Sequence, residues 1–234
     1  MANKKTKKNK TIIFSMGGSI VVPDEIDVKF LKVIKGFILN LLSRGYRLVI
    51  IIGGGELSKK YNQAAKALST VTNTDLDWMG IACTRVNAEL VRVILSKYAY
   101  PEVIADQNKI KNIGKYKLVL ACGLKPGQST DGQAVGWAKK LGAKEIINLT
   151  NLDRAYTADP KKDKNAKPLD NVSWAQYRKI VGDKWIPRLS TPFDPTASKL
   201  AQKYGMRVAV LNGRKLQNLK NYLAGKKFIG TLIE

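Results

Sequence analysis

Hydrophobic residues follow two alternating patterns along the chain, short continuous runs and longer amphipathic segments. The runs TIIFSM at 11–16 and YRLVIII at 46–52 are rich in β-branched residues, which predicts strands buried on both faces. Between them, apolar positions from Phe30 to Leu42 recur at helical spacing until Gly45 ends the segment. This alternation is typical of a mostly parallel sheet with helices packed against it.

The same rhythm continues to the last residues of the chain. Helices are expected after 53–55, near 78–98, after Asp131, around 174–181, over 195–204 and, as a short one, between 211 and 228. Strands are expected at 102–105, 116–122, 145–150, 206–211 and 228–233. No sequence repeat and no long flexible linker interrupts the pattern. We therefore expect one α/β domain over residues 11–234.

The first ten residues carry five lysines and precede an apolar run at 11–22, so that together they imitate a secretory signal peptide. We reject that interpretation because Gly17 and Gly18 break the run and no small-residue cleavage site follows it. Residues 1–10 are instead expected to form a disordered basic tail. No apolar stretch reaches the length of a membrane span.

Composition narrows the possible chemistry. Lysine and arginine total 41 against 18 acidic residues, and the resulting net charge of +23 attracts polyanions such as nucleotides, phosphates or nucleic acid. Histidine is absent, which excludes an imidazole base, a Ser-His-Asp triad and a histidine-containing zinc site. Cys83 and Cys122 match no metal spacing, so we expect two reduced thiols in a cytoplasmic protein.

Three glycine-rich turns follow predicted strands: GGS at 17–19, GGG at 53–55 and GLKPGQSTD at 123–131. Ligands of parallel sheets bind beyond the carboxyl ends of the strands, where glycine lets backbone amides approach a phosphate closely. One such turn is more often ordinary turn chemistry, whereas three at strand ends indicate a phosphate site. Neither the Walker motif nor the spaced glycines of dinucleotide sites is present.

A fourth polar segment, TNLDRAYTADP at 150–160, also follows a predicted strand. The order of GGS, GGG, PGQSTD and TN-x-D-x-x-Y-T-A-D-P resembles the archaeal-type uridylate kinases of the amino acid kinase superfamily over nearly the whole chain. The resemblance implies a three-layer αβα sandwich with a mostly parallel central sheet. Its acceptor-binding part would cover about 11–145 and its ATP-binding part about 146–234. It also implies ATP as donor, UMP as acceptor, Mg²⁺ bound with ATP, and a homohexamer.

The same resemblance assigns the residues that meet each substrate. Gly18, Lys59 and Asp131 match catalytic positions, and Asp131 would organise the cations. UMP is expected at Gly54, Asp77, Leu124, Lys125, Pro126, Gly127, Gln128, Ser129 and Thr130. ATP is expected at Gly17, Gly18, Ser19, Gly55, Lys59, Thr150, Asn151, Tyr156 and Asp159. No residue is assigned as a metal ligand.

The chain departs from the family pattern at four positions. Ser15 stands where many superfamily members carry a lysine, so charge neutralisation must come from elsewhere. Lys125 and Gln128 stand where the acceptor loop usually has histidines, and Arg154 replaces a usual glycine. A phosphate acceptor needs no general base, so a site built of glycine amides, Lys59, Lys125 and Mg²⁺ fits a chain without histidine.

Plainer roles exist for several of these residues. Asp131 could be a carboxylate favoured by a helix N-terminus, and Asp159 could belong to a simple turn. Lys59 and Lys60 could form a solvated helix face, which is the preferred interpretation for Lys60.

Two functional alternatives stay open. The first is another superfamily kinase that phosphorylates a carboxylate or carbamate. The second is a non-catalytic regulator that binds nucleic acid on the same fold, motivated by the +23 charge. The basic residues are spread along the sequence without interleaved aromatic residues, which disfavours the second alternative.

Overall fold

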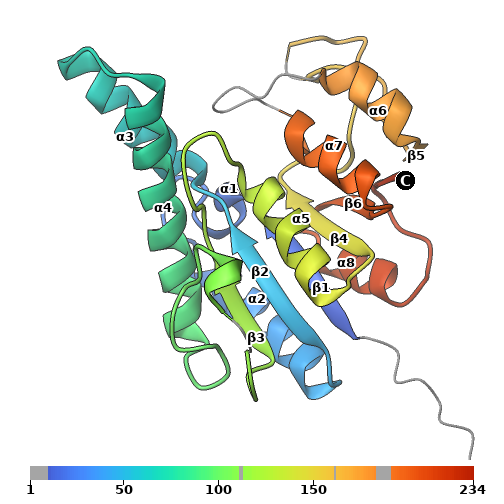
Figure 1. Cartoon of the computed structure of the whole chain (residues 1–234). Helices are drawn as coiled ribbons and strands as arrows, with labels where there is room; N and C mark the ends of the chain where they lie inside the picture. Colours follow the sequence, from blue (N-terminus) through green and yellow to red (C-terminus); the bar gives the residue numbers. More distant parts are fainter. Residues whose placement is uncertain (1–9, 111–112, 161, 183–190) are drawn as a thin grey trace, which may run out of the picture.

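The computed structural model describes residues 10–110, 113–160, 162–182 and 191–234, so the expected tail falls outside it except for Lys10. The described residues form a seven-stranded sheet with helices on both faces (Figure 1). The strands, in sheet order, are β3 (Leu118–Ala121), β2 (Arg47–Ile52), β1 (Thr11–Met16), β4 (Glu145–Thr150), β6 (Arg207–Asn212), β7 (Thr231–Ile233) and β5 (Asn171–Val172).

Parallel pairing joins β3, β2, β1, β4 and β6, and only β7 runs antiparallel to its neighbour β6. Because β1 pairs with both β2 and β4, the sheet is continuous across the boundary expected near residue 145. This confirms the α/β class and the mostly parallel sheet. The assignment of the two parts to acceptor and donor stays a prediction.

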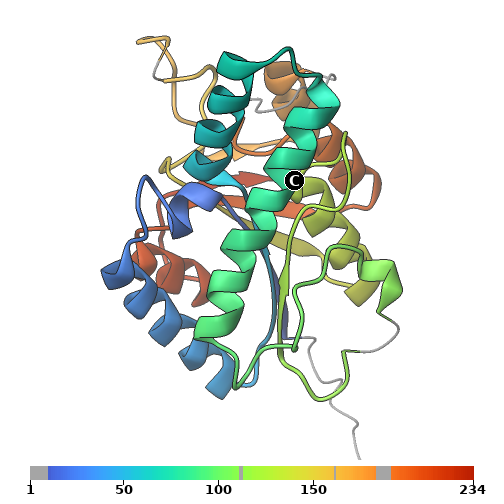
Figure 2. The ribbon, with the colours of Figure 1, turned by 90° about the vertical axis from the view of Figure 1, so that its left-hand side faces the viewer.

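Helices form a layer on each face of the sheet, as the view along its edge shows (Figure 2). In chain order they are α1 (Gly18–Val21), α2 (Val28–Ser43), α3 (Gly55–Leu68), α4 (Asn73–Ile94), α5 (Thr130–Leu141), α6 (Trp174–Val181), α7 (Pro195–Lys203) and α8 (Leu216–Leu223), with a 3-10 turn at Gln107–Lys109. Buried residues of α2, α4 and α8 pack on one face, and those of α5, α6 and α7 pack on the other. The expected three-layer sandwich is therefore confirmed.

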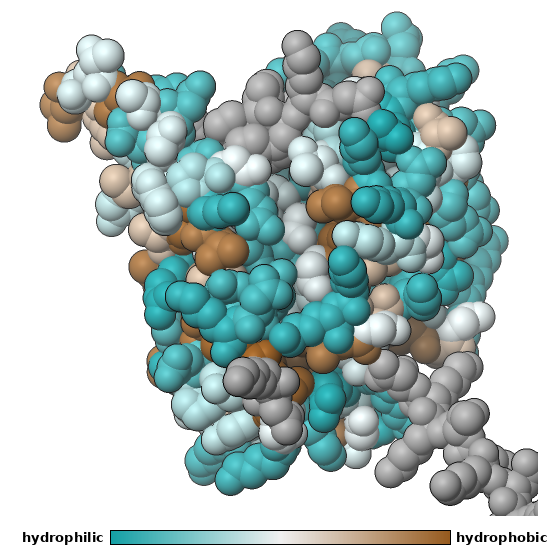
Figure 3. Space-filling model, in the orientation of Figure 1, coloured by the Kyte–Doolittle hydropathy of each residue, from teal (hydrophilic) through white to brown (hydrophobic). Residues whose placement is uncertain are grey.

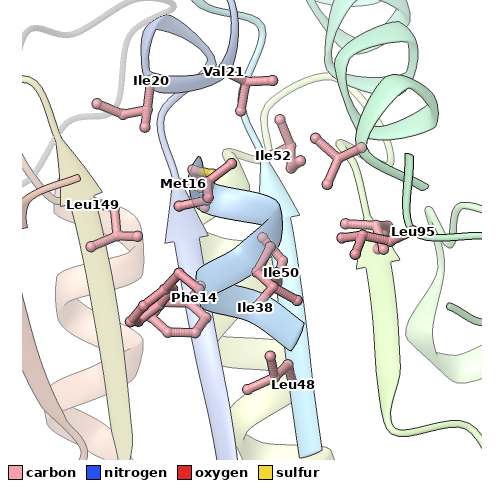
Figure 4. Close-up of a cluster of buried hydrophobic side chains, with 14 of the residues drawn as sticks. Phe14, Met16, Ile20, Val21, Ile38, Leu48, Ile50, Ile52, Leu95 and Leu149 are labelled. Carbon is pink, nitrogen blue, oxygen red and sulfur yellow. The ribbon is translucent and has the colours of Figure 1, made fainter. Parts of the chain in front are cut away.

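The central strands are mostly apolar because each of their two faces is covered. Phe14 and Met16 of β1 point into one core together with Ile50 and Ile52 of β2 (Figure 4). Ile13, next to Phe14 in sequence, belongs to the core on the opposite face. A strand buried on both sides needs no polar alternation, which is why continuous β-branched runs located these strands so closely.

Three expectations about local structure were wrong. Residues 102–105 form no strand but only a bridge between Ile104 and Ala121. The helix expected from Trp78 begins at Asn73, because Thr72 and Asp75 form a capping box in front of it. Two short elements, α1 and β5, were not anticipated, since four and two residues carry too little periodicity to read.

Among the described residues, no helix combines the length and apolar character that a membrane crossing needs. Cys83 and Cys122 are buried free thiols, and burial raises the pKa of both. A thiol with a raised pKa stays protonated and unreactive at neutral pH. The cysteines therefore have the structural role that the sequence suggested.

Tyr177 of α6 fixes the chain just before α7. Its hydroxyl donates to Phe193 O and accepts from Phe193 N, each at 3.0 Å, in a fully buried position. Replacing it as Tyr177→Phe leaves both backbone groups buried without a partner, which costs about 1–3 kcal/mol of unfolding free energy. We expect a melting temperature lower by roughly 2–4 °C per kcal/mol lost, measured by calorimetry.

The matched control is Tyr204→Phe, because the Tyr204 hydroxyl accepts from the exposed Lys139 Nζ at 3.2 Å and anchors no backbone. Its melting temperature should stay close to wild type, within the effect of about 0.5 kcal/mol usual for surface changes. Equal melting temperatures for the two variants would contradict the anchoring role of Tyr177.

Candidate active site

A cleft of about 440 Å³ opens beyond the carboxyl ends of the central strands. It lies where parallel sheets bind ligands, and α3, α5 and α7 all begin at its wall. The lining residues come from segments far apart in sequence: Gly17, Gly18, Ser19, Gly53, Gly54, Gly55, Ser58, Lys59, Asn62, Leu76, Asp77, Gly80, Ile81, Thr84, Gly123, Lys125, Gln128, Ser129, Thr130, Asp131, Thr191 and Asp194.

The two glycine turns after β1 and β2 touch each other through their backbones. A Cβ at Gly18 would lie 2.3 Å from Gly53 O, and one at Gly55 would lie 2.5 Å from Gly18 C. Gly55 also has a φ of +60°, in the left-handed region that side chains avoid. These turns therefore require glycine, and they leave backbone amides at helix starts facing the cleft, a favourable site for an anionic group.

Asn87 of α4 holds the second glycine turn from behind. Its buried Nδ2 donates to Gly53 O at 2.9 Å and to Gly54 O at 3.1 Å. Thr84, one turn earlier, accepts from Gly123 N at 2.9 Å through Oγ1. One helix therefore links the turn after β2 to the loop after β3.

Two lysines line the cleft, Lys59 on α3 and Lys125 on the loop after β3. The Lys59 Nζ lies 2.6 Å from Glu56 Oε2, in a pair with more than half of the lysine side chain exposed. An exposed pair of this kind is worth little, so Lys59 is free to turn toward an anion in the cleft. Lys60, in contrast, points outward to Asp24, which agrees with the solvated role preferred for it.

Asp131 accepts three hydrogen bonds at the floor of the cleft. Ser15 Oγ donates to Oδ1 at 2.6 Å, Asn148 Nδ2 donates to the same oxygen at 3.5 Å, and Asp194 N donates to Oδ2 at 3.2 Å. The α5 cap is Ser129, whose Oγ accepts from Gly132 N at 2.9 Å. Asp131 lies in the first turn of α5, as its plainer role expects, but it does not cap the helix, and its three hydrogen bonds come from outside α5.

A second carboxylate, Asp194, lies beside Asp131. Its Oδ1 caps α7 by accepting from Thr196 N and Ala197 N, and its Oδ2 accepts from Ser129 Oγ. Desolvation, together with the nearby charge of Asp194, raises the pKa of Asp131 to about 7. The described structure gives neither carboxylate an ion-pair partner, and the neutral Ser15 hydroxyl donates to Asp131 instead.

Asp77 lies inside α4, one turn after its start, and not at a helix start as the sequence suggested. Its Oδ2 accepts from Gly127 N at 3.0 Å, which ties α4 to the loop after β3. Nearby, Asn62 Nδ2 donates to Leu76 O at 3.3 Å while its buried Oδ1 has no partner among the described residues. The cleft wall thus presents a carboxylate and an amide oxygen, both hydrogen-bond acceptors.

Most of the residues predicted from the sequence come together here. The cleft brings in Gly17, Gly18, Ser19, Gly54, Gly55, Lys59, Asp77, Lys125, Gln128, Ser129, Thr130 and Asp131. Leu124, Pro126 and Gly127 lie on the same loop without lining the cleft. Sequence reasoning missed Asp194, Asn62, Asn87 and Thr84, whose only sequence signal was a polar residue inside or before a helix.

The residues predicted to bind adenosine do not line this cleft; Thr150 ends β4, and the others lie on the chain that follows it. Thr150 Oγ1 accepts from Leu152 N at 3.0 Å, the backbone of Tyr156 pairs with Pro168, and Asp159 O closes a turn by accepting from Lys162 N. These hydrogen bonds hold the backbone of the segment in place. Binding of ATP by Thr150, Asn151, Tyr156 and Asp159 stays a prediction.

Comparison with known proteins agrees with the fold. The amino acid kinase family matches residues 10–212. The uridylate kinase of Thermococcus sibiricus is 35% identical over 225 residues, which cover 95% of this chain and 99% of that protein. The uridylate kinase of Pyrococcus abyssi is 32% identical with the same coverage.

Comparison with solved structures also finds uridylate kinases. The crystal structure of uridylate kinase from Archaeoglobus fulgidus has a TM-score of 0.76 and 29% identity, covering 95% of this chain and 99% of that chain. A UMP kinase from Bacillus anthracis, at 20% identity and a TM-score of 0.75, shares the fold. The chain therefore belongs to the amino acid kinase family, in the group of the archaeal uridylate kinases.

Proposed function

We propose that this protein transfers the γ-phosphoryl group of ATP to UMP and releases UDP and ADP. One observation carries the proposal: a single cleft joins two glycine turns, the start of α5 and Asp77, the elements needed to hold two phosphates and a ribose side by side. The names of the archaeal relatives give the substrates. Cytoplasmic location fits the two buried, unpaired cysteines.

The protein's task in this reaction is to position the substrates and stabilise charge. The attacking oxygen belongs to the acceptor phosphate, which is already ionised, so the absence of histidine removes nothing that the reaction needs. Gly54 would hold the acceptor phosphate, while Gly17, Gly18, Ser19 and Gly55 would hold those of the donor. Lys59 and Lys125 would offset the charge that gathers between them.

The carboxylates fit Mg²⁺ that arrives with ATP. Asp131 and Asp194 are adjacent and lack a cationic partner in the described structure, and burial together with the charge of Asp194 raises the pKa of Asp131. Oxygen ligands and unbalanced negative charge suit Mg²⁺, which in nucleotide sites takes few protein ligands. We infer that these two residues would hold the ion or its bound waters, and that the ion would shield the transferring phosphoryl group.

We infer that the protein is a homo-oligomer, and the resemblance suggests a homohexamer. The outer side of α4 exposes Trp78, Val86 and Val93 over more than half of each residue, along one side of the helix. Hydrophobic surface is visible along the left-hand side of the molecule, where α4 lies (Figures 1 and 3). Such a stripe is typical of a surface that a second copy covers.

The acceptor assay tests the proposed function directly. ADP formation should be fastest with UMP and much slower with CMP, AMP, acetylglutamate or carbamate. Equal rates with acetylglutamate or carbamate would favour another kinase of the family. Binding of nucleic acid with no turnover on any acceptor would favour the regulator.

Asp131→Asn should lower kcat at least tenfold, about 1.4 kcal/mol of barrier, because the lost charge would organise cations in the transition state. The fold should tolerate the change, since the Ser15 hydroxyl can accept from the new amide while Asp194 N keeps an oxygen acceptor.

Asp131→Asn should not lower the melting temperature, although it should lower kcat. A carboxyl whose pKa rises from 3.8 to about 7 on folding binds more protons in the folded state, so wild type loses stability as pH rises through this window. The Asp131→Asn variant has no carboxyl group at this position, so it does not lose stability as the pH rises through this window. Without Mg²⁺, its melting temperature at pH 8 should equal or exceed that of wild type. A clear fall together with unchanged kcat would assign Asp131 a purely structural role.

Asp77→Ala should raise the KM for UMP by roughly tenfold to a hundredfold, on the order of 1.5–3 kcal/mol, because a carboxylate accepts strongly from ribose hydroxyls. The KM for ATP should move little. Asp77→Asn separates two roles, since its amide oxygen can still accept from Gly127 N. A KM for UMP unchanged in the Asn variant would reduce Asp77 to a loop anchor. Asp75→Ala, which removes the capping box, should lower stability and leave both KM values intact.

Val86→Lys should dissociate the oligomer, because a lysine on the apolar stripe would be buried without a partner. Light scattering after size-exclusion chromatography should then give the chain mass of 25.9 kDa. Val33→Lys is the control, as Val33 on α2 is 59% exposed against 60% for Val86. Identical masses for both variants would remove α4 from the subunit interface.

A further inference from the structure

The edge of the sheet opposite the cleft gathers basic residues from separate parts of the chain. Arg47 N donates to Lys10 O at 3.0 Å and Leu48 N donates to Lys117 O at 2.7 Å, so the residues before β1, β2 and β3 stand side by side. Arg44, Lys97 and Lys115 come from the turns next to them. We call Lys10, Arg44, Arg47, Lys97, Lys115 and Lys117 the basic edge. The amino ends of β1, β2 and β3, where this edge lies, form the lower end of the sheet in Figure 1.

These six cations have no carboxylate partners among the residues that the structure describes. Elsewhere, Arg92, Arg154 and Arg214 pair with acidic residues. The acidic side chains on elements next to the edge are Glu89, Glu102 and Glu145. Arg92 holds Glu89, and Arg207 holds Glu145. Glu102, the third of them, is exposed and pairs with none of the six cations in the described structure, so the basic edge keeps an excess of positive charge.

A hollow of about 590 Å³ lies within this edge, between the end of α2 and the segments that flank β3. Leu39 and Leu42 contribute apolar surface, and Lys97, Lys115 and Lys117 contribute charge. Tyr98, half exposed, and Tyr116 add aromatic rings to its wall. The hollow can therefore receive a flat apolar group that carries negative charge beside it.

Aromatic rings and cations alternate in space along the edge. Lys10 Nζ and the Arg44 guanidinium lie 5.7 and 5.6 Å from the centre of the Tyr46 ring, and Lys115 Nζ lies 5.8 Å from that of Tyr116. The sequence itself sets each tyrosine beside basic residues, in RGYR at 44–47, KY at 97–98 and KYK at 115–117, and the fold brings these segments together at one edge. The expectation that the basic residues lack aromatic neighbours is therefore wrong for this edge.

We propose that the basic edge binds single-stranded nucleic acid. Lysine and arginine would contact successive phosphates, and a base would enter the hollow and stack on Tyr98. A sulfated sugar or a lipid headgroup would use the charge but has no flat ring for the hollow. The site lies at the opposite ends of the strands from the cleft, so the proposal does not depend on the proposed kinase activity.

The test compares two variants of the full chain with equal net charge. The edge variant carries Lys97→Glu, Lys115→Glu and Lys117→Glu. The control variant carries Lys32→Glu, Lys35→Glu and Lys66→Glu, at exposed positions of α2 and α3 that do not line the hollow. Both keep the lysines of residues 1–9, so the comparison isolates the edge. Melting curves should establish that both variants are folded.

Fluorescence anisotropy with a labelled single-stranded RNA of about 12 nucleotides, within the range of known single-strand sites, measures affinity at several salt concentrations. We expect the edge variant to bind at least tenfold more weakly than the control variant. The slope of log K against log salt concentration should be shallower for the edge variant than for the control variant, by about 0.7 for each phosphate that the edge variant no longer neutralises. Equal weakening in both variants would reduce the effect to net charge, and absence of binding by wild type would overturn the proposal.

A third variant tests the stacking part of the proposal. Tyr98→Ala should weaken RNA binding several-fold, and Tyr98→Phe should retain it, because stacking needs the ring and not the hydroxyl. Wild type should bind heparin, duplex RNA and anionic vesicles more weakly than the single strand at equal salt. An unchanged Tyr98→Ala variant, or vesicles or heparin bound as tightly as RNA, would overturn the assignment to single-stranded nucleic acid.

Discussion

The contact between two glycine turns determines how the rest of the site is arranged. Gly18 and Gly55 approach so closely that a single methyl group on either would overlap backbone atoms of the other turn. This contact fixes where α1 and α3 begin relative to each other and brings the ends of β1 and β2 to one point. Asn87 then locks the arrangement by binding two carbonyls of the second turn. This part of the cleft is therefore closely packed main chain, with little freedom to shift when a ligand enters.

The other side of the cleft carries two carboxylates, and the described structure shows no cation that balances their negative charge. Asp131 and Asp194 stand together although their repulsion opposes folding, and neutral donors such as Ser15 and Asn148 hold them. Tyr177 secures Phe193, and through it the start of α7 with Asp194. A cluster that lowers stability while several residues maintain its geometry is the arrangement expected of a functional site.

The sequence located the sheet well and the helix ends and side-chain networks less well. Continuous β-branched runs identify β1, β2 and β4 because such strands have no solvent face. α4 begins five residues before the predicted start, because its first turn is polar and depends on the Thr72–Asp75 capping box rather than on apolar spacing. The glycine turns and Asp131 could be found from local motifs. Asp194 could not, because its role depends on α7 packing beside α5, and nothing near Asp194 in sequence records that contact. Ser15 was recognised as a departure from the family, but only the structure shows that its hydroxyl donates to Asp131.

Parallel strands also separate the molecule into two electrostatic regions. A strand of six residues such as β1 spans about 20 Å, roughly twice the Debye length at physiological ionic strength. Charges at the amino ends of the strands are thus largely screened from the phosphates at the carboxyl ends. Evolution can therefore alter surface charge at one end, for solubility or for a new partner, without retuning the chemistry at the other.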